Sequence, residues 1–138
     1  MLNNKTQAKY KTSHQKNIEI KMRDGTILRH NMTRPDTDGK FPVLLERTPY
    51  NKEGGSENNI GSPEFFASRG YIVIIQDVRG RFASDGDFYP FKDDGNGQNK
   101  DGYDTTEWLA KQEWSTGNIG TIGGSYSGAT QYRNAISN

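Results

Sequence analysis

The stretch Ile119-Gly120-Thr121-Ile122-Gly123-Gly124-Ser125-Tyr126-Ser127-Gly128 decides the fold of this chain. Its first four residues have the composition of a short buried strand, and residues 129–136, which follow it, have the composition of a helix. A strand, a Gly-x-Ser turn and a helix in immediate succession form a nucleophile elbow, which holds a serine hydroxyl on a strained turn. The glycines fit this interpretation, because backbone approaches backbone closely at such a turn and leaves no room for Cβ atoms.

Two serines in this stretch compete for the role of nucleophile. Ser125 lies at the corner between strand and helix and follows two glycines, whereas Ser127 falls within the first helical turn. We therefore interpret Ser125 as the nucleophile. The backbone amide of Tyr126, at the start of the helix, would then point at an oxyanion that develops on a substrate. A Gly/Ser-rich hexamer alone is more often an ordinary turn, so the flanking strand and helix carry this interpretation.

The composition narrows the class of protein. With a formal net charge of +1, the 138-residue chain gives no reason to expect nucleic acid or an anionic membrane as a partner. It has no cysteine and two histidines, His14 and His30, which argues against a disulfide framework, a metal site or a cofactor site built from these residues. The length fits one domain, although an apolar share of 30% is low for a domain that folds by itself.

The first 16 residues are rich in Asn, Lys, Gln and Thr, and we interpret them as a flexible N-terminal tail. They lack the apolar core of a signal peptide, and nowhere do about 18 apolar residues run together as a membrane span requires. The lack of a signal peptide favours a cytoplasmic protein.

Periodicity and turn signals predict an α/β fold. Alternating apolar and polar residues at 18–22 predict a strand, Asp24-Gly25 a hairpin turn, and residues 26–32 the returning strand. Short apolar runs at 42–45 and 71–75 predict strands buried on both faces. Helices are predicted at 63–69, with Ser62 as N-cap, and from a capping box at 104–107 through residue 111. A hairpin followed by alternating strands and helices predicts a sheet built with right-handed crossovers.

Three motifs fall at the carboxyl ends of predicted parallel strands, where open α/β sheets bind ligands. They are Arg47-Thr48-Pro49-Tyr50-Asn51-Lys52, Asp77-Val78-Arg79-Gly80-Arg81 and the elbow at Ser125. Tyr50 would place a protonated phenol in the loop that supplies the second oxyanion donor in α/β-hydrolases. Its alternative is plain packing, which is commoner for a tyrosine after Thr-Pro. Asp77 and Arg79 are interpreted as structural, fixing the loop by charge-assisted hydrogen bonds.

The polar, glycine-rich segment 85–101 offers no ligand site of its own. Its Asp93-Asp94-Gly95-Asn96-Gly97 run lacks the spacing of an EF-hand, and we interpret it as a solvated turn. The chain has no Gly-x-x-x-x-Gly-Lys phosphate loop.

Further motifs give a family resemblance. They are Met22-Arg23-Asp24-Gly25, Ser84-Asp85-Gly86, Asp101-Gly102-Tyr103-Asp104-Thr105 and Glu107-Trp108-Leu109. Together with the three motifs above, in this order, they make the chain similar, from about residue 18 to residue 138, to the N-terminal part of the cocaine esterase/X-prolyl dipeptidyl-peptidase family of serine hydrolases. The resemblance implies that residues 17–138 form the N-terminal portion of an α/β-hydrolase domain, truncated after the nucleophile helix, with the family's helical cap and C-terminal jelly-roll domains absent.

The resemblance also implies an activity on ester or amide bonds, with Ser125 acylated and with the Tyr50 hydroxyl and the Tyr126 amide as the oxyanion hole. The chain departs from the family in two minor ways. Ser127 stands where an apolar residue is expected, and the loop 92–100 is longer and more polar than usual, which a surface tolerates.

A third departure concerns the catalytic triad, whose order in α/β-hydrolases is serine, acid, histidine. The thirteen residues after Ser125 contain no Asp, Glu or His, and both histidines precede it. Three interpretations stay open: an inactive fragment of a serine hydrolase, a non-catalytic binding module, and one half of a split hydrolase whose complementary chain carries Asp and His. The fragment is favoured, and its substrate would be a small-molecule ester, amide or peptide.

Overall fold

The computed structural model describes residues 7–54 and 62–137, and its centre is a five-stranded sheet with the order β1-β2-β4-β3-β5. The elements are β1 (Thr12–Lys21), β2 (Ile27–Pro35), β3 (Phe41–Thr48), α1 (Pro63–Ala67), β4 (Ile72–Asp77), α2 (Asp101–Ala110), β5 (Ser115–Thr121) and α3 (Ser125–Ala135). The strands β1, β2 and β4 are antiparallel neighbours, whereas β4, β3 and β5 run parallel. This arrangement confirms the predicted α/β fold with crossover helices.

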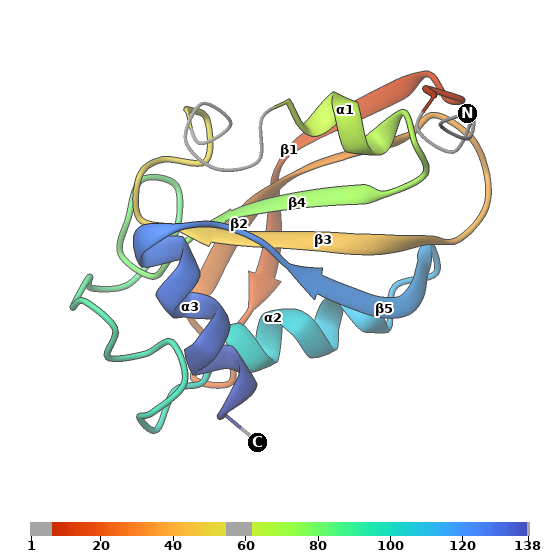
Figure 1. The fold of residues 1–138 in the computed structure, drawn as a ribbon. Helices are drawn as coiled ribbons and strands as arrows, with labels where there is room; N and C mark the ends of the chain where they lie inside the picture. The colour runs from red at the N-terminus through yellow and green to blue at the C-terminus, as the bar shows by residue number, and fades with distance from the viewer. Residues whose placement is uncertain (1–6, 55–61, 138) are drawn as a thin grey trace.

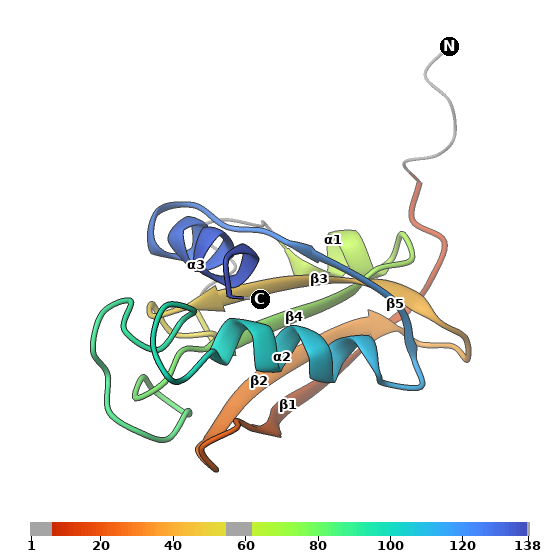
Figure 2. The same cartoon turned by 90° about the horizontal axis from the view of Figure 1, so that it is seen from below.

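The helices cover both faces of the sheet (Figures 1 and 2). Side chains alternate between faces along β4, so Ile72 and Ile74 pack with Leu109 of α2, whereas Val73 and Ile75 pack with Phe66 of α1. Every residue of β4 is buried. The predicted buried run at 71–75 is therefore the central strand of the sheet.

The first strand begins earlier than the sequence predicted. The flexible tail predicted over residues 1–16 is wrong for its last five residues, because Thr12 already pairs with Pro35 in the β1–β2 hairpin. The alternation is interrupted at Asn17, which has a φ of 54° and lies where the register shifts between Gln15 and Ile18. Such a bulge resets the two-residue period and hides the first half of the strand from a pattern search. Residues 1–6 lie outside the described part.

The capping box predicted at 104–107 is wrong, whereas Ser62 is the N-cap of α1 as predicted but makes no side-chain capping bond. Helix α2 begins at Asp101, so Asp104 lies inside its first turn instead of capping it. The Asp104 carboxylate accepts hydrogen bonds from the backbone and guanidinium of Arg23, 81 residues earlier. At α1, the Ser62 hydroxyl donates to the Glu64 carboxylate and makes no capping bond to the helix backbone. The Asp104 carboxylate therefore fastens the hairpin turn to α2 through Arg23 instead of capping the helix.

The strand that leads to the elbow is not buried as predicted. In β5 only Ser115 is buried, because β5 pairs with β3 on one side and with no strand on the other within residues 7–54 and 62–137. No helix of the described part is long and apolar enough to cross a membrane.

Candidate active site

Ser125 lies at the turn between β5 and α3. It is the first residue of α3, exposed to solvent, and its φ of 53° falls in the left-handed region. A non-glycine residue held there costs on the order of 1–3 kcal/mol, and such residues cluster at functional sites. Gly123 makes the turn possible, because its φ is 135° and a Cβ on it would lie 2.5 Å from the Ser127 Cβ. The geometry is that of a strained elbow.

The Tyr50 side chain reaches this serine from the loop after β3. Its hydroxyl lies 3.3 Å from the Ser125 Oγ, and either oxygen can donate the hydrogen bond. The two loops meet because β3 and β5 are parallel neighbours that end at the same edge. The Tyr50 amide donates to the Thr48 hydroxyl at 3.0 Å, which fixes the start of the loop, while 45% of the tyrosine remains exposed. The expected proximity of Tyr50 and Ser125 is thus observed.

The Tyr126 side chain turns away from Ser125 toward the loop between β4 and α2. Its hydroxyl donates to the Asp94 Oδ2 at 3.3 Å and accepts from the Phe91 amide at 2.9 Å. Its ring stacks on the Phe91 ring, with centroids 4.2 Å apart and planes 16° apart. Burial raises the pKa of Tyr126 above its usual value, and the neighbouring Asp94 carboxylate adds to the effect.

Asp94 overturns the prediction of a solvated turn at residues 93–97. It is 4% exposed, and its carboxylate pairs with the Arg47 guanidinium at 2.9 Å. Arg47 is buried as well, so each charge stabilises the other in a poorly solvated place. Sequence reasoning missed this pair because its partners stand 47 residues apart. No local signal in the acidic run indicates it.

Asp77 and Arg79 are structural, as interpreted, but they do not bind each other. The buried Asp77 carboxylate accepts from the backbone amides of Lys52 at 2.8 Å and Ala83 at 3.1 Å. Arg79 pairs with Asp24 and Asp101, each at 2.7 Å. Its hydrogen bond lowers the pKa of Asp24 to about 2. These contacts fasten the β4 carboxyl end to the hairpin turn and to α2.

Neither histidine reaches the serine. His30 on β2 is fully buried with its ring edge-on to Trp108, and burial together with the Lys52 charge lowers its pKa to about 4. His14 on β1 hydrogen-bonds the Thr33 hydroxyl and pairs with Glu64 beside α1. Within the described part of the chain, the Ser125 hydroxyl hydrogen-bonds Tyr50 and no base.

The site therefore places the Tyr50 hydroxyl beside an exposed serine hydroxyl, and among the described residues no base hydrogen-bonds this serine. Those residues also include no cluster of three or more His, Asp or Glu that could hold a metal ion.

Comparisons with known proteins agree with this architecture. The family model of the X-Pro dipeptidyl-peptidase (S15 family) matches residues 24–138. Cocaine esterase from Rhodococcus sp. (strain MB1 Bresler) is 44% identical over 123 residues, which are 88% of this chain and 21% of that protein. The chain thus spans about a fifth of the length of this curated relative.

Two solved structures have the same arrangement of elements. A CocE/NonD family hydrolase from Staphylococcus aureus superposes with a TM-score of 0.78 at 33% identity, over 88% of this chain and 24% of that one. An alpha-amino acid ester hydrolase gives a TM-score of 0.71 at 32% identity, over 88% of this chain and 22% of its own. The sheet and helices described above are therefore part of an α/β-hydrolase fold.

Proposed function

The chain belongs to the X-Pro dipeptidyl-peptidase (S15) family of hydrolases, and from this premise we propose that it carries the nucleophile of a serine hydrolase. The enzyme would cleave ester or amide bonds through an acyl-enzyme on Ser125. The observation that carries the proposal is the left-handed Ser125 at the start of α3, with the Tyr50 hydroxyl 3.3 Å from its Oγ.

The proposed reaction uses three groups of this chain. The Ser125 Oγ attacks the carbonyl carbon of the substrate and gives its proton to a base. The resulting oxyanion accepts hydrogen bonds from the Tyr50 hydroxyl and the Tyr126 amide, and the alcohol or amine then leaves with a proton returned by the base. Water, deprotonated by the same base, releases the acyl group as an acid and restores Ser125.

The base and its acidic partner are proposed to come from outside these 138 residues, because His14 and His30 are both held elsewhere. A further segment of a longer polypeptide or a complementary chain carrying Asp and His would supply them. We expect the 138-residue chain alone to hydrolyse activated esters feebly, since a serine without a base is a poor nucleophile. The names of the relatives, cocaine esterase and alpha-amino acid ester hydrolase, support an ester as the substrate, and the family name, X-Pro dipeptidyl-peptidase, supports a peptide bond.

An exogenous base tests the proposal on the chain by itself. We expect p-nitrophenyl acetate to acetylate Ser125 slowly, and the rate of acetylation to rise in proportion to added imidazole, which takes the place of the histidine. Because imidazole can also activate the water that removes the acetyl group, the reaction is stopped with acid at early times, and peptide mapping by mass spectrometry then locates the acetyl group. Tyr50→Phe should lower the rate about a hundredfold, because it removes one oxyanion donor.

Two serine variants serve as controls. Ser125→Ala should abolish imidazole-dependent labelling, whereas Ser127→Ala, two residues further on and buried, should retain it. Imidazole-dependent labelling that persists in Ser125→Ala, or wild-type Ser125 that imidazole does not accelerate, would contradict the proposal and favour a non-catalytic binding module.

A further inference from the structure

Tyr126 is held by its side chain at three points, all in the loop between β4 and α2. The phenol donates to the Asp94 carboxylate, accepts from the Phe91 amide, and its ring lies flat on the Phe91 ring. A tyrosine held only by packing could still rotate about its ring axis and slide. The two hydrogen bonds to the hydroxyl and the stacked ring fix both the orientation and the position of the Tyr126 side chain.

Asp94, the first of the two residues that hold Tyr126, is itself bound to buried side chains of the sheet. Its Oδ1 accepts from the Arg47 Nη1 at 2.9 Å, and both side chains are almost completely buried. Arg47 in turn donates from Nε to the Gln76 side chain at 2.8 Å, and Gln76 donates to the Thr105 hydroxyl at 3.0 Å. A series of contacts therefore connects Tyr126, through the carboxyl ends of β3 and β4, to α2. The side chains of Arg47, Gln76 and Thr105 in this series are buried.

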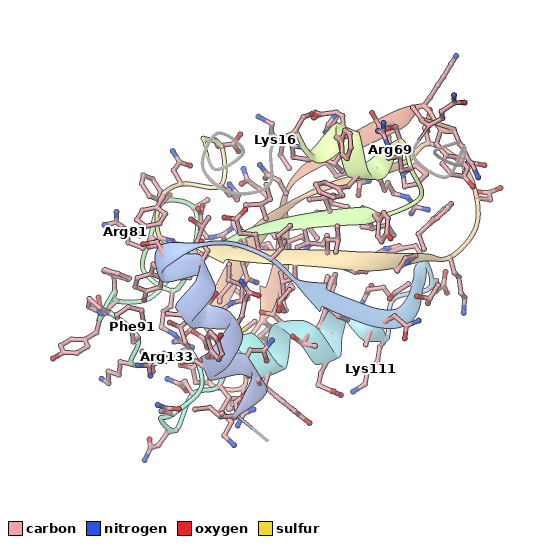
Figure 3. The ribbon with its side chains drawn as sticks, viewed as in Figure 1. Lys16, Arg69, Arg81, Phe91, Lys111 and Arg133 are labelled. Atoms are coloured by element: carbon pink, nitrogen blue, oxygen red, sulfur yellow. The ribbon has the colours of Figure 1, made fainter. Side chains whose placement is uncertain are left out.

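The Phe91 end is rooted in α3 itself. Figure 3 shows Phe91 and Arg133 next to one another along this helix. The Arg133 guanidinium lies over the Phe91 ring, 4.9 Å from its centroid, and donates to the Phe91 carbonyl at 3.4 Å. Gly95, in the same loop as Phe91, lies so close to the backbone of α3 that a Cβ on it would lie 2.1 Å from the Arg133 carbonyl oxygen. The Phe91 ring is thus fixed between Tyr126 and Arg133, two turns apart on α3.

The peptide between Ser125 and Tyr126 needs such a support. Ser125 is in a strained conformation with a φ of 53°, so the turn would relax if nothing held the next residue. The N–H of this same peptide is the proposed oxyanion donor. A donor lowers the barrier when it already points at the place where charge develops, and it loses most of its effect when it must first reorient.

We propose that Asp94 and Phe91 are positioning residues for the reaction at Ser125, which fix the Tyr126 side chain and thereby aim the Tyr126 amide at the oxyanion. This pair, Phe91 and Asp94, is called the elbow clamp below. The inference rests on the proposed function, since it assigns a purpose to the amide that the acyl-enzyme mechanism uses. It gives the polar loop 92–100 a role in catalysis without contact to the substrate.

The test is Tyr126→Phe, which keeps the stacked ring and the amide but removes the hydroxyl that the elbow clamp binds. We expect imidazole-dependent acetylation of Ser125 to slow about tenfold at saturating p-nitrophenyl acetate, while the ester concentration for half-maximal rate stays unchanged. This split separates a misaimed oxyanion donor from a damaged binding site. The matched control is Tyr132→Phe on the same helix, where the side chain is 79% exposed and makes no hydrogen bond within the described residues, and its rate should equal wild type.

A second measurement needs no reaction. In NMR spectra the backbone amide resonance of residue 126 should be sharp in the wild type. Both Tyr126→Phe and Phe91→Leu should shift and broaden it, while the resonances of β4 stay in place. If imidazole accelerates the labelling of wild-type Ser125 and Tyr126→Phe is labelled at the same rate, the elbow clamp is overturned while the proposed function stands. If wild-type Ser125 is never labelled, the proposed function fails, and an unchanged Tyr126 resonance in both variants would then overturn the elbow clamp as well.

Discussion

The strands β4 and β5 both run parallel to β3 and end at the edge that carries the site, yet their surroundings differ. All six residues of β4 are buried, whereas β5 has one buried residue. Among the described residues β4 lies between two strands and β5 pairs with β3 alone, and the helices α1 and α2 cover opposite faces of the sheet (Figure 1). The motif after β4 is fixed by buried ion pairs of Asp77 and Arg79. The motif after β5 holds the exposed Ser125. The proposed nucleophile therefore follows a weakly buried edge strand, whereas the motif after β4 follows a fully buried one, and the proposed elbow clamp would join these two regions.

The largest effect should come from the centre. Ile74→Ala removes a fully buried side chain that packs with Leu45 and Leu109, and we expect it to lower the free energy of unfolding by about 4 kcal/mol. The matched change on the edge strand, Ile119→Ala, should cost about 1 kcal/mol, because this side chain is partly exposed and its neighbours can close around the smaller residue. Urea unfolding of the two variants measures both values. Equal losses would mean that β5 is as firmly packed as β4.

The same contrast decides what the sequence could predict. The apolar runs at 71–75 and 42–45 predicted their strands correctly, because burial on both faces leaves a continuous apolar pattern that any neighbour would satisfy. The elbow was predicted because its Gly-Gly-Ser run between a strand and a helix is a local pattern, and the turn itself requires glycine at position 123. Tyr50 was predicted to meet Ser125 from the rule that parallel strands end at one edge, and the 3.3 Å distance agrees with it.

What the sequence could not predict depends on partners far along the chain. Asp94 is a surface residue by every local rule, and its buried carboxylate is paired by Arg47 and hydrogen-bonded by Tyr126, two residues that the fold brings beside it. Asp104 has the local pattern of a helix cap, but Arg23 offers its carboxylate an ion pair at 2.6 Å. The elbow clamp was missed for the same reason, since a phenylalanine in a polar loop does not indicate which ring it will stack on.

The second prediction uses pH to probe the centre through His30, which pairs in register with Gln76 of β4. Burial lowers its pKa in the folded chain to about 4 from the usual 6.5, so the unfolded chain binds the proton more readily. His30 should therefore leave the free energy of unfolding unchanged above pH 6.5. Its contribution should lower that free energy by about 3 kcal/mol as the pH drops from 6.5 to 4. Urea unfolding across this range measures the fall.

Replacing the titrating ring isolates this contribution. His30→Leu should make the fall between pH 6.5 and 4 smaller by about 3 kcal/mol, whereas His14→Gln, a change at the half-exposed histidine beside α1, should leave it in place. Carboxylates add a loss of their own toward the acid end of this window, because the pKa values of Asp24 and Glu53 are lowered to about 2 in the folded chain and the unfolded chain therefore binds their protons first. The difference between the wild type and His30→Leu, which share these carboxylates, isolates the contribution of His30. Parallel curves for the wild type and His30→Leu would show that the ring finds a partner or water in solution.

The smallest effect should come from Ser127 in α3, two residues after Ser125. The Ser127 hydroxyl is buried without a hydrogen-bond partner among the described residues, so Ser127→Ala should raise the free energy of unfolding by about 1 kcal/mol. Thr130, one turn further on, provides the opposite case, because its hydroxyl donates to the Ser127 carbonyl at 2.8 Å. Thr130→Val should therefore lower stability by about 1 kcal/mol. Changes of opposite sign in the free energy of unfolding, measured with urea, would show that α3 carries an unsatisfied hydroxyl on the face that packs against β3. A loss of stability in Ser127→Ala would mean that this hydroxyl is hydrogen-bonded in solution. The region around the edge strand β5 would then be better packed than its exposure indicates.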